Sequence, residues 1–445
     1  MTLTAASSAQ ALASFAAGQS WAEIPAPVRH QARRALVNIF ATAIAGCREP
    51  AVEIALGVMA PFAGPATCSL IGRGERRDAA LAAFVNAMAA NIHDFDDTHP
   101  ETIIHPTAPV APALLALAEI RPCSGADLLR AFLIGAETAC RIGNAVAPSH
   151  YARGWHITST CGAFGASAGA AALLGLDARQ TVWALANASV QAAGLVETLG
   201  TMSKSISVGN AARNGLLSAL LAERGFEGPP GALDAFLRLT SDAPRPDALT
   251  GRLGTEWTFA TNTCKPYPVG VVLNPVIDAS LQIAAASGFR AAEVEAVHLA
   301  GHPLLGARAD RPDVVTGRES QVSAQHAIAI VWRRGRAGLD EFDDAAVAET
   351  LAAGRPRVEF TDEPSRDPAS VHMTVRMRGG GVFEAEIAAA RGTLANPLSD
   401  RELEQKLTGL AARAGFTGDA EALARAVWGL EDAPDAGALA RLAAG

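Results

Sequence analysis

The sequence is poor in charge and above all in lysine. Charged residues make up 18% of the 445 residues, and the only lysines are Lys204, Lys265 and Lys406. The formal net charge is −8, and no basic stripe or run of basic and aromatic residues occurs. Nucleic-acid-binding proteins present clustered basic residues to phosphates, so the sequence argues against that class.

Aromatic residues are also scarce. They account for 5% of the chain, whereas hydrophobic residues account for 49%, so the apolar mass is alanine, leucine and valine. Small apolar side chains suit helices that pack closely together. A chain with so little charge is also expected to lose surface to a partner, most simply in a homodimer.

Two further signals are missing. The six cysteines form no C-x-x-C pair, which argues against disulfides, zinc and iron–sulfur sites and favours reduced thiols in a cytoplasm. The first residues, MTLTAASSAQALASF, lack a basic region, so we expect no signal peptide. The predicted location is therefore cytoplasmic.

One segment is uncharged over the length of a membrane span but lacks the composition of one. Gly154–Leu176 carries no formal charge, but it consists mostly of glycine, alanine, serine and threonine. Few of its residues are large and apolar, so it is a weak candidate for insertion. We predict a buried helix with neighbouring helices pressed close to it.

The order of the elements predicts the fold class. Apolar residues recur at helical spacing through about residue 240, and alternating patterns appear after about residue 260. VEAVHLAGHP and RVEFTDE are typical of strands, and VHMTVRMRGGGVFEAEIAA is typical of a β-hairpin. Helical spacing then returns, beginning with a capping box at Ser399 and Glu402. We predict a mainly α fold with a large helical domain over 1–259, a smaller α/β lid domain over 260–393, and C-terminal helices over 394–445 that complete the helical domain.

The stretch NIHDFDDTHPETIIHPT, residues 91–107, holds three histidines and three aspartates. We predict that the helix before it ends at about His99, because Pro100 cannot continue a helix. Asp94, Asp97 and Thr98 then share one face of the last turn. A carboxylate at the negative end of a helix costs about 0.3–1 kcal/mol. We therefore predict a functional use for these side chains, the alternative being a solvated helix end.

A metal site is one such use. Aspartate and histidine suit Mg²⁺, Mn²⁺ or Fe²⁺. A second aspartate-rich motif would be expected beside H-D-x-D-D, and none occurs. We therefore predict no metal.

The lysines and one further histidine suggest other site residues. Lys204 lies in TLGTMSKSISVGNAARNG, which we predict to be a loop before a helix whose free N–H groups can hold an anion. Lys265 lies in the rigid loop CKPYPVG at the predicted domain boundary, within reach of a cleft. His156 starts the predicted buried helix. For each, an ordinary structural residue is the alternative.

Several of these segments together resemble the MmgE/PrpD family. The similar segments are DFDDTHPETIIHPTAPVAPALLALAE, ARGWHITSTCGAFGASAGAAALLGLD, MSKSISVGNAARNGLLSALLAERGFEGP, CKPYPVGVVLNPVIDA and NPLSDRELEQKL. They span nearly the whole chain in the family's order. The family includes 2-methylcitrate dehydratase, cis-aconitate decarboxylase and iminodisuccinate epimerase. The resemblance implies a helical domain with a smaller α/β lid, a homodimer, and no metal or organic cofactor.

The resemblance also implies site residues. The positions that match the decarboxylase branch by motif are Asp94, Thr98, His105, His156, Lys204 and Lys265. Where the family has the tyrosine of a serine-x-x-tyrosine helix, this sequence has His326, three residues after Ser323. An imidazole titrates near pH 6.5 and a phenol near 10, so this departure changes the chemistry available.

These residues predict acid–base chemistry on a small di- or polycarboxylate. We assign Lys204 and Lys265 to binding substrate carboxylates, and His105 and His156 to proton transfer. Asp94 is expected to fix an imidazole tautomer and Thr98 to donate a hydrogen bond.

A second base at His326 suits an epimerase, which removes a proton on one face and returns one on the other. Together with the similarity of KPYPVGVVLNPVIDA to the epimerase-like branch, this favours iminodisuccinate epimerase. The alternatives are a lyase, either 2-methylcitrate dehydratase or cis-aconitate decarboxylase, and a non-catalytic helical dimer that binds a polycarboxylate.

Overall fold

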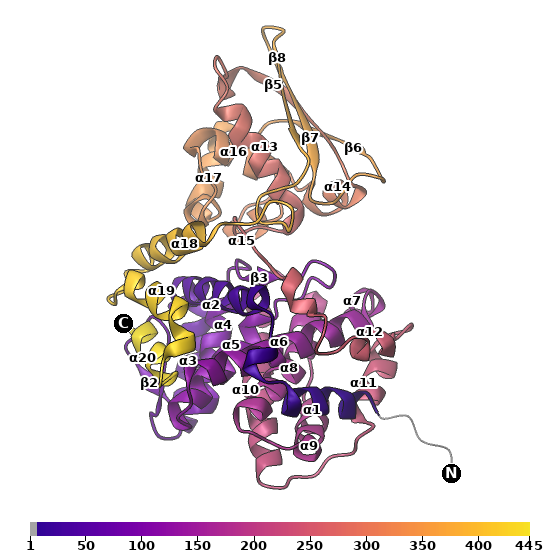
Figure 1. The fold of residues 1–445 in the computed structure, drawn as a ribbon. Helices are drawn as coiled ribbons and strands as arrows, with labels where there is room; N and C mark the ends of the chain where they lie inside the picture. The colour runs from indigo at the N-terminus through magenta and orange to yellow at the C-terminus, as the bar shows by residue number, and fades with distance from the viewer. Residues whose placement is uncertain (1–6) are drawn as a thin grey trace. The chain divides into compact units, whose positions relative to one another are not determined.

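The computed structural model describes residues 7–445 and divides into two compact units. Unit 1 joins Met1–Asn262 to Ser399–Gly445, and unit 2 is Thr263–Leu398. Helices are the main element, as Figure 1 shows. The predicted mainly α fold is confirmed, and among the described residues only unit 2 contains a sheet of more than two strands.

Unit 1 consists of helices joined by short segments. The capping box predicted at Ser399 and Glu402 is present at the start of α18, and Ser124 caps α6 with Asp127 in the same way. The α-helices of unit 1 are α1 (Ser8–Gly18), α2 (Ala26–Gly46), α3 (Pro50–Met59), α4 (Ala79–Asn91), α5 (Thr107–Ile120), α6 (Gly125–Val146), α7 (Ser149–Ala152), α8 (Ile157–Leu173), α9 (Ala178–Ser189), α10 (Met202–Glu223), α11 (Ala232–Thr240), α12 (Pro246–Thr250), α18 (Asp400–Arg413), α19 (Ala420–Trp428) and α20 (Gly437–Ala444). Its short strands are β1 (Cys68–Ser69), β2 (Arg76–Arg77) and β3 (Asp97–Thr98).

Helix α8 is buried from Ile157 to Ala172. A Cβ added at Gly165 would lie 2.7 Å from the carbonyl oxygen of Gly135 on α6, and a Cβ added at Gly215 on α10 would lie 2.5 Å from Cβ of Ala166. The backbones of α6, α8 and α10 therefore approach so closely that only small residues fit between them. This confirms the buried helix predicted for the uncharged segment. Within residues 7–445, no helix has both the length and the apolar character needed to cross a membrane.

The helix before the acidic stretch ends earlier than predicted. Helix α4 ends at Asn91 instead of about His99. Asp94 follows with a φ of 53°, a left-handed conformation that cannot continue a helix, and Asp97 begins β3. The shared helical face predicted for Asp94, Asp97 and Thr98 is therefore wrong.

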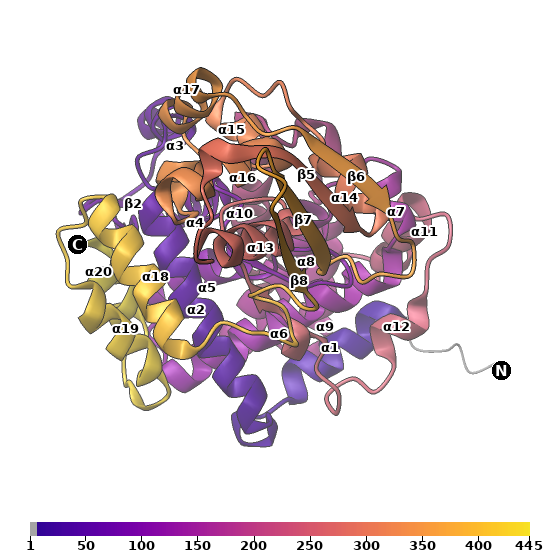
Figure 2. The same cartoon turned by 90° about the horizontal axis from the view of Figure 1, so that it is seen from above.

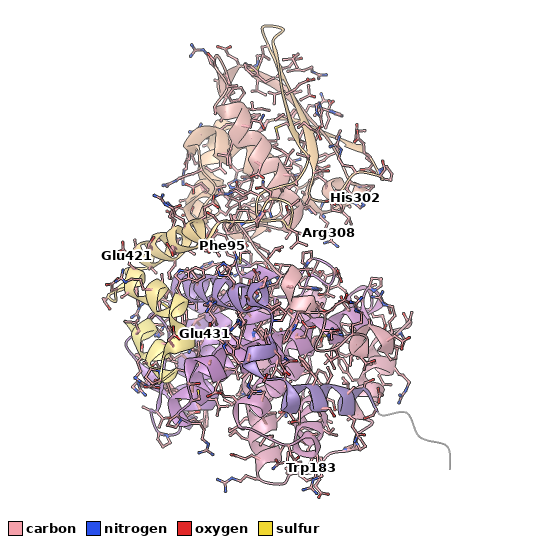
Figure 3. The ribbon with its side chains drawn as sticks, in the orientation of Figure 1. Phe95, Trp183, His302, Arg308, Glu421 and Glu431 are labelled. Carbon is pink, nitrogen blue, oxygen red and sulfur yellow. The ribbon has the colours of Figure 1, made fainter. Side chains whose placement is uncertain are left out.

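The C-terminal segment belongs to unit 1. Lys406 on α18 donates hydrogen bonds to the Asn38 side chain at 2.8 Å and to the Phe95 carbonyl at 2.7 Å. Its ammonium lies 3.5 Å from the centre of the ring of Phe95, a residue labelled in Figure 3. Glu431, labelled in the same figure, accepts a hydrogen bond from Arg33 at 2.8 Å. The third lysine of the chain thus fixes the acidic stretch from a residue more than 300 positions away.

Unit 2 is an α/β unit. Its four-stranded sheet has the order β6-β5-β7-β8, with β5 and β6 parallel and the other pairs antiparallel. The predicted strands and hairpin are confirmed as β5, β6 and the β7–β8 pair, with Gly380 at a φ of 83° in the turn. The elements are β4 (Thr263–Cys264), α13 (Asn274–Ala284), β5 (Val294–Gly301), α14 (Pro303–Ala309), α15 (Gly317–Ser320), α16 (Ala324–Arg334), α17 (Asp344–Ala353), β6 (Val358–Asp362), β7 (Val371–Met377) and β8 (Val382–Ile387).

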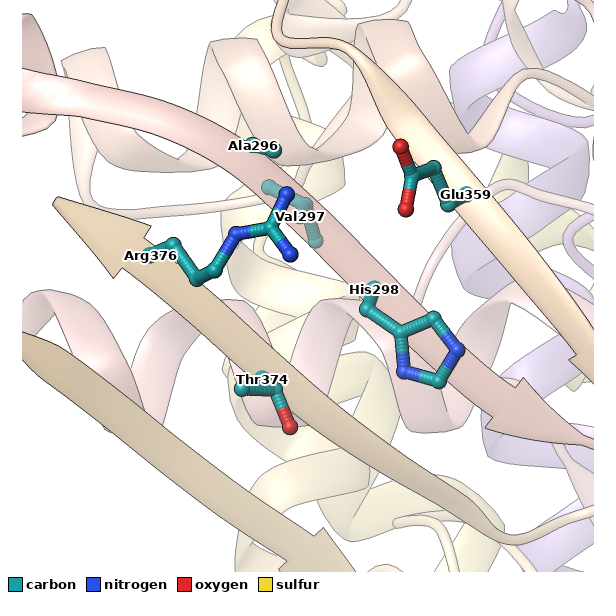
Figure 4. A pocket seen from close by; sticks show the side chains of 6 residues that line it. All are labelled: Ala296, Val297, His298, Glu359, Thr374 and Arg376. Atoms are coloured by element: carbon teal, nitrogen blue, oxygen red, sulfur yellow. The ribbon is translucent and has the colours of Figure 1, made fainter. Parts of the chain in front are cut away.

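The two faces of this sheet differ, because successive side chains of a strand point to opposite faces. Val371, Met373 and Val375 of β7 are buried in a core shared with α13 and α16, whose packing beside the strands can be followed in Figure 2. The other face is polar. It carries a shallow depression of about 180 Å³, which Figure 4 shows lined by Ala296, Val297, His298, Glu359, Thr374 and Arg376.

Candidate active site

Five of the predicted residues lie together in unit 1, where the first turns of three helices meet. His105 precedes α5, His156 is the residue before α8, and Lys204 lies in the first turn of α10. The backbone N–H of His105 donates to Oγ1 of Thr158 in the first turn of α8, at 3.1 Å. Lys204 was predicted in a loop before the helix, but α10 begins at Met202. Helix N-termini carry partial positive charge and favour anionic ligands.

Asp94 links the lysine and one histidine. The Lys204 ammonium donates to Oδ1 of Asp94 at 2.6 Å, and Nε2 of His105 lies 3.4 Å from the same oxygen. Lys204 and His105 are buried, whereas the Asp94 side chain is 34% exposed. The left-handed backbone of Asp94 is a sparsely populated conformation for a residue with a side chain, and such residues cluster at functional sites.

The tautomer of His105 follows from its partners. Its Nδ1 lies 2.8 Å from the carbonyl oxygen of Asp97 and 3.3 Å from Oγ1 of Thr98. A carbonyl oxygen can only accept, so Nδ1 carries the hydrogen and donates it. The Asp97 carbonyl therefore fixes this tautomer, a role that the sequence had given to the Asp94 carboxylate. Nε2 remains to face Asp94.

His156 is 3% exposed and neutral at physiological pH. Burial, followed by the positive charges of Lys204 and His105, lowers the pKa of its imidazole to about 3. Its Nδ1 lies 2.5 Å from Oγ of Ser159. A neutral imidazole beside a lysine–carboxylate pair has one nitrogen available as an acceptor.

The buried carboxylate of Asp97 forms further hydrogen bonds beside these residues. Oδ2 of Asp97 accepts from Oγ1 of Thr107 and from Nδ2 of Asn262, both at 2.5 Å. Burial and the neighbouring Asp96 raise the pKa of Asp97 to about 6. A functional use was predicted for Asp97, but not for its partners Thr107 and Asn262. The motif DFDDT contains the signal for Asp97, but nothing local indicates Asn262, which lies 165 positions away.

The same cluster contains a possible set of metal ligands. Asp94, Asp96 and His105 offer ligand atoms within 4.8 Å of one another. The Lys204 ammonium, however, already lies beside Oδ1 of Asp94. It supplies a positive charge where a metal would bind and repels a second cation.

We therefore expect activity to survive prolonged treatment with EDTA. Turnover measured before and after treatment, and again after addition of Mg²⁺ or Fe²⁺, should stay the same, because Lys204 supplies the charge. Loss of turnover on treatment with recovery on adding a metal would contradict the metal-free prediction.

Lys265 and His326 belong to unit 2. Lys265 is buried in the loop after β4. His326 is fully buried in the first turn of α16, where its Nδ1 lies 3.0 Å from Oγ1 of Thr350 and its Nε2 donates to the carbonyl of Glu341 at 2.8 Å. Burial lowers its pKa to about 4. Both ring nitrogens are thus used inside unit 2, which removes the structural support for His326 as a second base.

Replacing His326 with alanine should impair stability more than catalysis. The change leaves a cavity and an unpaired Glu341 carbonyl, and we expect unfolding free energy to fall by about 2–4 kcal/mol. Thermal unfolding and turnover per folded molecule would be measured, with His298→Ala on the polar face of the sheet as the control. A large loss of turnover in a fully folded His326→Ala protein would instead place His326 in the site.

Acid should destabilise the protein through its buried histidines. Burial lowers the pKa values of His99, His150, His156 and His326 to about 4, 4, 3 and 4, so between about pH 4 and 6.5 the unfolded chain binds protons that the folded chain does not. Asp97, whose pKa is raised, acts in the opposite sense below about pH 6.

For these five groups together, we expect an uptake of about three protons on unfolding near pH 5, four by the histidines less one by Asp97. The unfolding free energy should fall by roughly 4 kcal/mol per pH unit there, at about 1.4 kcal/mol per proton. Denaturant unfolding between pH 7 and 4.5 measures this slope, and a stability independent of pH over that range would refute it.

In unit 1, a buried lysine and two buried histidines at helix N-termini lie near the carboxylate of Asp94, an arrangement that favours an anionic ligand. The chain belongs to the MmgE/PrpD family. The model of the MmgE/PrpD N-terminal domain matches residues 10–244, and the model of the C-terminal domain matches residues 267–432.

Individual relatives include enzymes. The chain is 34% identical over 276 residues to the cis-aconitate decarboxylase of Aspergillus terreus, an alignment that covers 57% of this chain and 56% of that protein. It therefore spans little more than half the length of that relative. It is 27% identical to the cis-aconitate decarboxylase-like protein oryM of Aspergillus oryzae, over 95% of this chain and 94% of that protein. Identity to cis-aconitate decarboxylase of Homo sapiens is 28%, over 82% and 79% of the two chains.

Proposed function

We propose that this chain is a cofactor-independent enzyme that transfers protons at the carbon next to a carboxylate of a small polycarboxylate, and that it is a lyase that decarboxylates cis-aconitate or a close analogue. The observation that carries the proposal is the contact of Lys204 and His105 with one oxygen of Asp94. The names of the relatives support the lyase branch.

We expect positively charged groups to bind the carboxylates of the substrate. An ammonium has three N–H donors, so Lys204 can keep its bond to Asp94 and donate another to a substrate carboxylate. The first turns of α5, α8 and α10 add the partial charge of their N–H groups. Charge that develops on the carboxylate during reaction is stabilised by the same groups, and one such donor contributes about 10²–10³ in rate. Lys265 is proposed as a further carboxylate ligand.

The decarboxylation shifts two electron pairs and needs one proton. The bond to the departing CO₂ breaks, its pair forms a new double bond, and the former double bond takes up a proton at the carbon next to a remaining carboxylate. We assign delivery of that proton to Nε2 of His105, because the adjacent Asp94 carboxylate stabilises the protonated ring. His156 stays neutral and accepts a hydrogen bond through Nε2. Thr98 helps to orient the His105 ring, because its Oγ1 lies beside Nδ1 of that ring.

Epimerisation of iminodisuccinate is the second candidate. It needs two bases on opposite faces of one carbon, and two of the buried imidazoles of unit 1, His105 and His156, offer such a pair. His326 is not needed as one of the two bases, and both of its ring nitrogens have partners within unit 2. A hydro-lyase acting on 2-methylcitrate would draw on the same groups. We further propose that the enzyme is a cytoplasmic homodimer.

One experiment separates these reactions. The purified protein would be incubated in D₂O with cis-aconitate, with 2-methylcitrate and with single stereoisomers of iminodisuccinate, and followed by proton NMR. We expect itaconate with one deuterium at the newly protonated carbon. Deuterium entering iminodisuccinate as another isomer appears would establish the epimerase, and a vinyl signal from 2-methylcitrate would establish the dehydratase. Binding of all three without turnover would leave a non-catalytic binding protein.

A further inference from the structure

Two serines connect His156 to the backbone of α10 in an unbroken line. Nδ1 of His156 lies 2.5 Å from Oγ of Ser159, which lies 2.6 Å from Oγ of Ser207. Oγ of Ser207 lies 2.8 Å from the carbonyl oxygen of Lys204, one helical turn earlier. Ser159 is in the first turn of α8 and Ser207 in the second turn of α10, so this chain of hydrogen bonds, which we call the serine relay, joins the two helices.

The direction of every bond in the serine relay follows from its far end. The Lys204 carbonyl can only accept a hydrogen bond, so Ser207 donates its single hydroxyl hydrogen to that oxygen. Ser207 can then only accept from Ser159, so Ser159 donates its own hydroxyl hydrogen to Ser207. Ser159 can therefore only accept from His156, so that Nδ1 of His156 carries the hydrogen and Nε2 carries none.

We propose that Ser159 and Ser207 are positioning residues that hold His156 as the Nδ1–H tautomer and so keep Nε2 as a bare acceptor for the reaction. The benefit to catalysis rests on the function proposed above, whereas the tautomer itself does not. None of the hydrogen bonds recorded for His156 among residues 7–445 uses Nε2. Lys204, His105 and Asp94 are the charges that act on the ring.

The packing around Ser159 holds its hydroxyl in place. Gly194 has a φ of 149°, and a Cβ there would lie 2.7 Å from Oγ of Ser159 and 3.4 Å from Cβ of His156. The Gly194 carbonyl accepts from the backbone N–H of His156 at 3.0 Å. Gly194 thus packs closely against the serine relay, and a side chain at this position would collide with Ser159.

A short serine–histidine contact also suggests a nucleophilic serine, but the directions exclude it. In a nucleophilic pair the histidine accepts the serine hydrogen. Here that hydrogen goes to Ser207, and the histidine donates. Ser159 is therefore an acceptor that sets the state of the ring.

The test reads the tautomer directly. The protein would be labelled with ¹⁵N-histidine, and the His156 signals would be assigned by their loss in His156→Gln. At neutral pH the wild type should show a protonated Nδ1 and an unprotonated Nε2. Ser207→Ala frees the Ser159 hydroxyl to donate, and the ring should shift towards the Nε2–H form. Ser159→Ala removes the acceptor, and a mixture of tautomers should appear.

Two further variants separate positioning from mere packing. Ser207→Thr keeps the hydroxyl and should restore the wild-type tautomer. Ser167→Ala removes another buried hydroxyl from α8, one that has no hydrogen-bond partner, and should leave the His156 signals unchanged. Ser159→Ala and Ser207→Ala should also lower kcat by about tenfold with little change in KM. Each variant loses one hydrogen bond that orients the His156 ring, and a tenfold change corresponds to the usual contribution of one such bond.

The outcomes distinguish the two proposals. A wild-type His156 protonated on Nε2, or a tautomer that Ser159→Ala and Ser207→Ala leave unchanged, would overturn the serine relay. The expected tautomers in a protein without turnover on any polycarboxylate would uphold the relay and overturn the proposed function. Equal loss of kcat in Ser167→Ala would show that the kinetic effect is one of packing and would overturn the positioning role.

Discussion

Replacing Lys204 with methionine should lower kcat/KM by about 10²–10³ while leaving the protein folded. Methionine keeps the length and apolar stem of the side chain but removes the ammonium that lies 2.6 Å from Asp94. The substrate carboxylate then loses its cation in unit 1, and Asp94 gains an uncompensated negative charge beside the same ligand. Steady-state kinetics on the substrate found by NMR would measure the loss. The melting temperature should change little, because Asp94 is partly open to water.

The same helix supplies a matched control. Arg213 lies further along α10 and stacks over Phe84, with its guanidinium 5.2 Å from the ring centre. Arg213→Met removes one positive charge from α10 at a place away from Asp94, and kcat/KM should stay near the wild-type value. Equal losses in the two variants would mean that the overall charge of the helix matters, and that Lys204 has no special contact with the substrate.

Replacing His105 with asparagine should lower kcat by about 10²–10⁴, the usual contribution of a general acid or base. The asparagine amide can take the place of Nδ1 and keep the hydrogen bond to the Asp97 carbonyl, which is 2.8 Å long in the wild type. Only Nε2, the atom that faces Asp94, is lost. Stability should therefore change by no more than about 1 kcal/mol. Turnover and thermal unfolding would be measured on the same preparation.

His99 provides a matched control for His105, because the same ring atom can be removed from it. It is also buried in the stretch 91–107, its Nδ1 lies 2.8 Å from Oγ1 of Thr102, and its Nε2 has no hydrogen-bond partner. His99→Asn removes the same atom as His105→Asn from a ring that does not contact Asp94. We expect its turnover to remain within about threefold of the wild type. A loss like that of His105→Asn would show that the acidic stretch tolerates no change, and the assignment of His105 as proton donor would fail.

The two predictions concern one arrangement in which a single aspartate serves two partners. Asp94 holds the ammonium that binds the substrate and faces the imidazole that delivers the proton. Its left-handed backbone turns the chain sharply after α4 and brings the carboxylate to both. Phe95, the next residue, is held by Lys406 through its carbonyl and its ring. The C-terminal helices of unit 1 thereby stabilise the turn on which the site depends.

Local features of this protein follow from its sequence alone. The capping box at Ser399, the glycine-containing turn of the β7–β8 hairpin and the burial of α8 are all formed as predicted. Each depends on residues within one turn or one pair of strands, where propensity and periodicity act directly. Ser159 belongs with them, because a residue three positions after His156 at a helix start must lie beside it. The spacing of His156 and Ser159 is therefore a local signal for their contact.

Other features were decided by tertiary structure. The sequence motifs identify Asp94, His105, His156 and Lys204 as candidate site residues. They do not determine which atom faces which partner, because those contacts join segments up to 110 positions apart. The end of α4 at Asn91 and the partners of His326 likewise depend on charges and carbonyls supplied by distant elements. The sequence by itself therefore determined the helices, the strands and the kinds of side chain at the site. Packing alone decided their protonation, because the burial and hydrogen bonds that set a tautomer or a pKa exist only when remote segments meet.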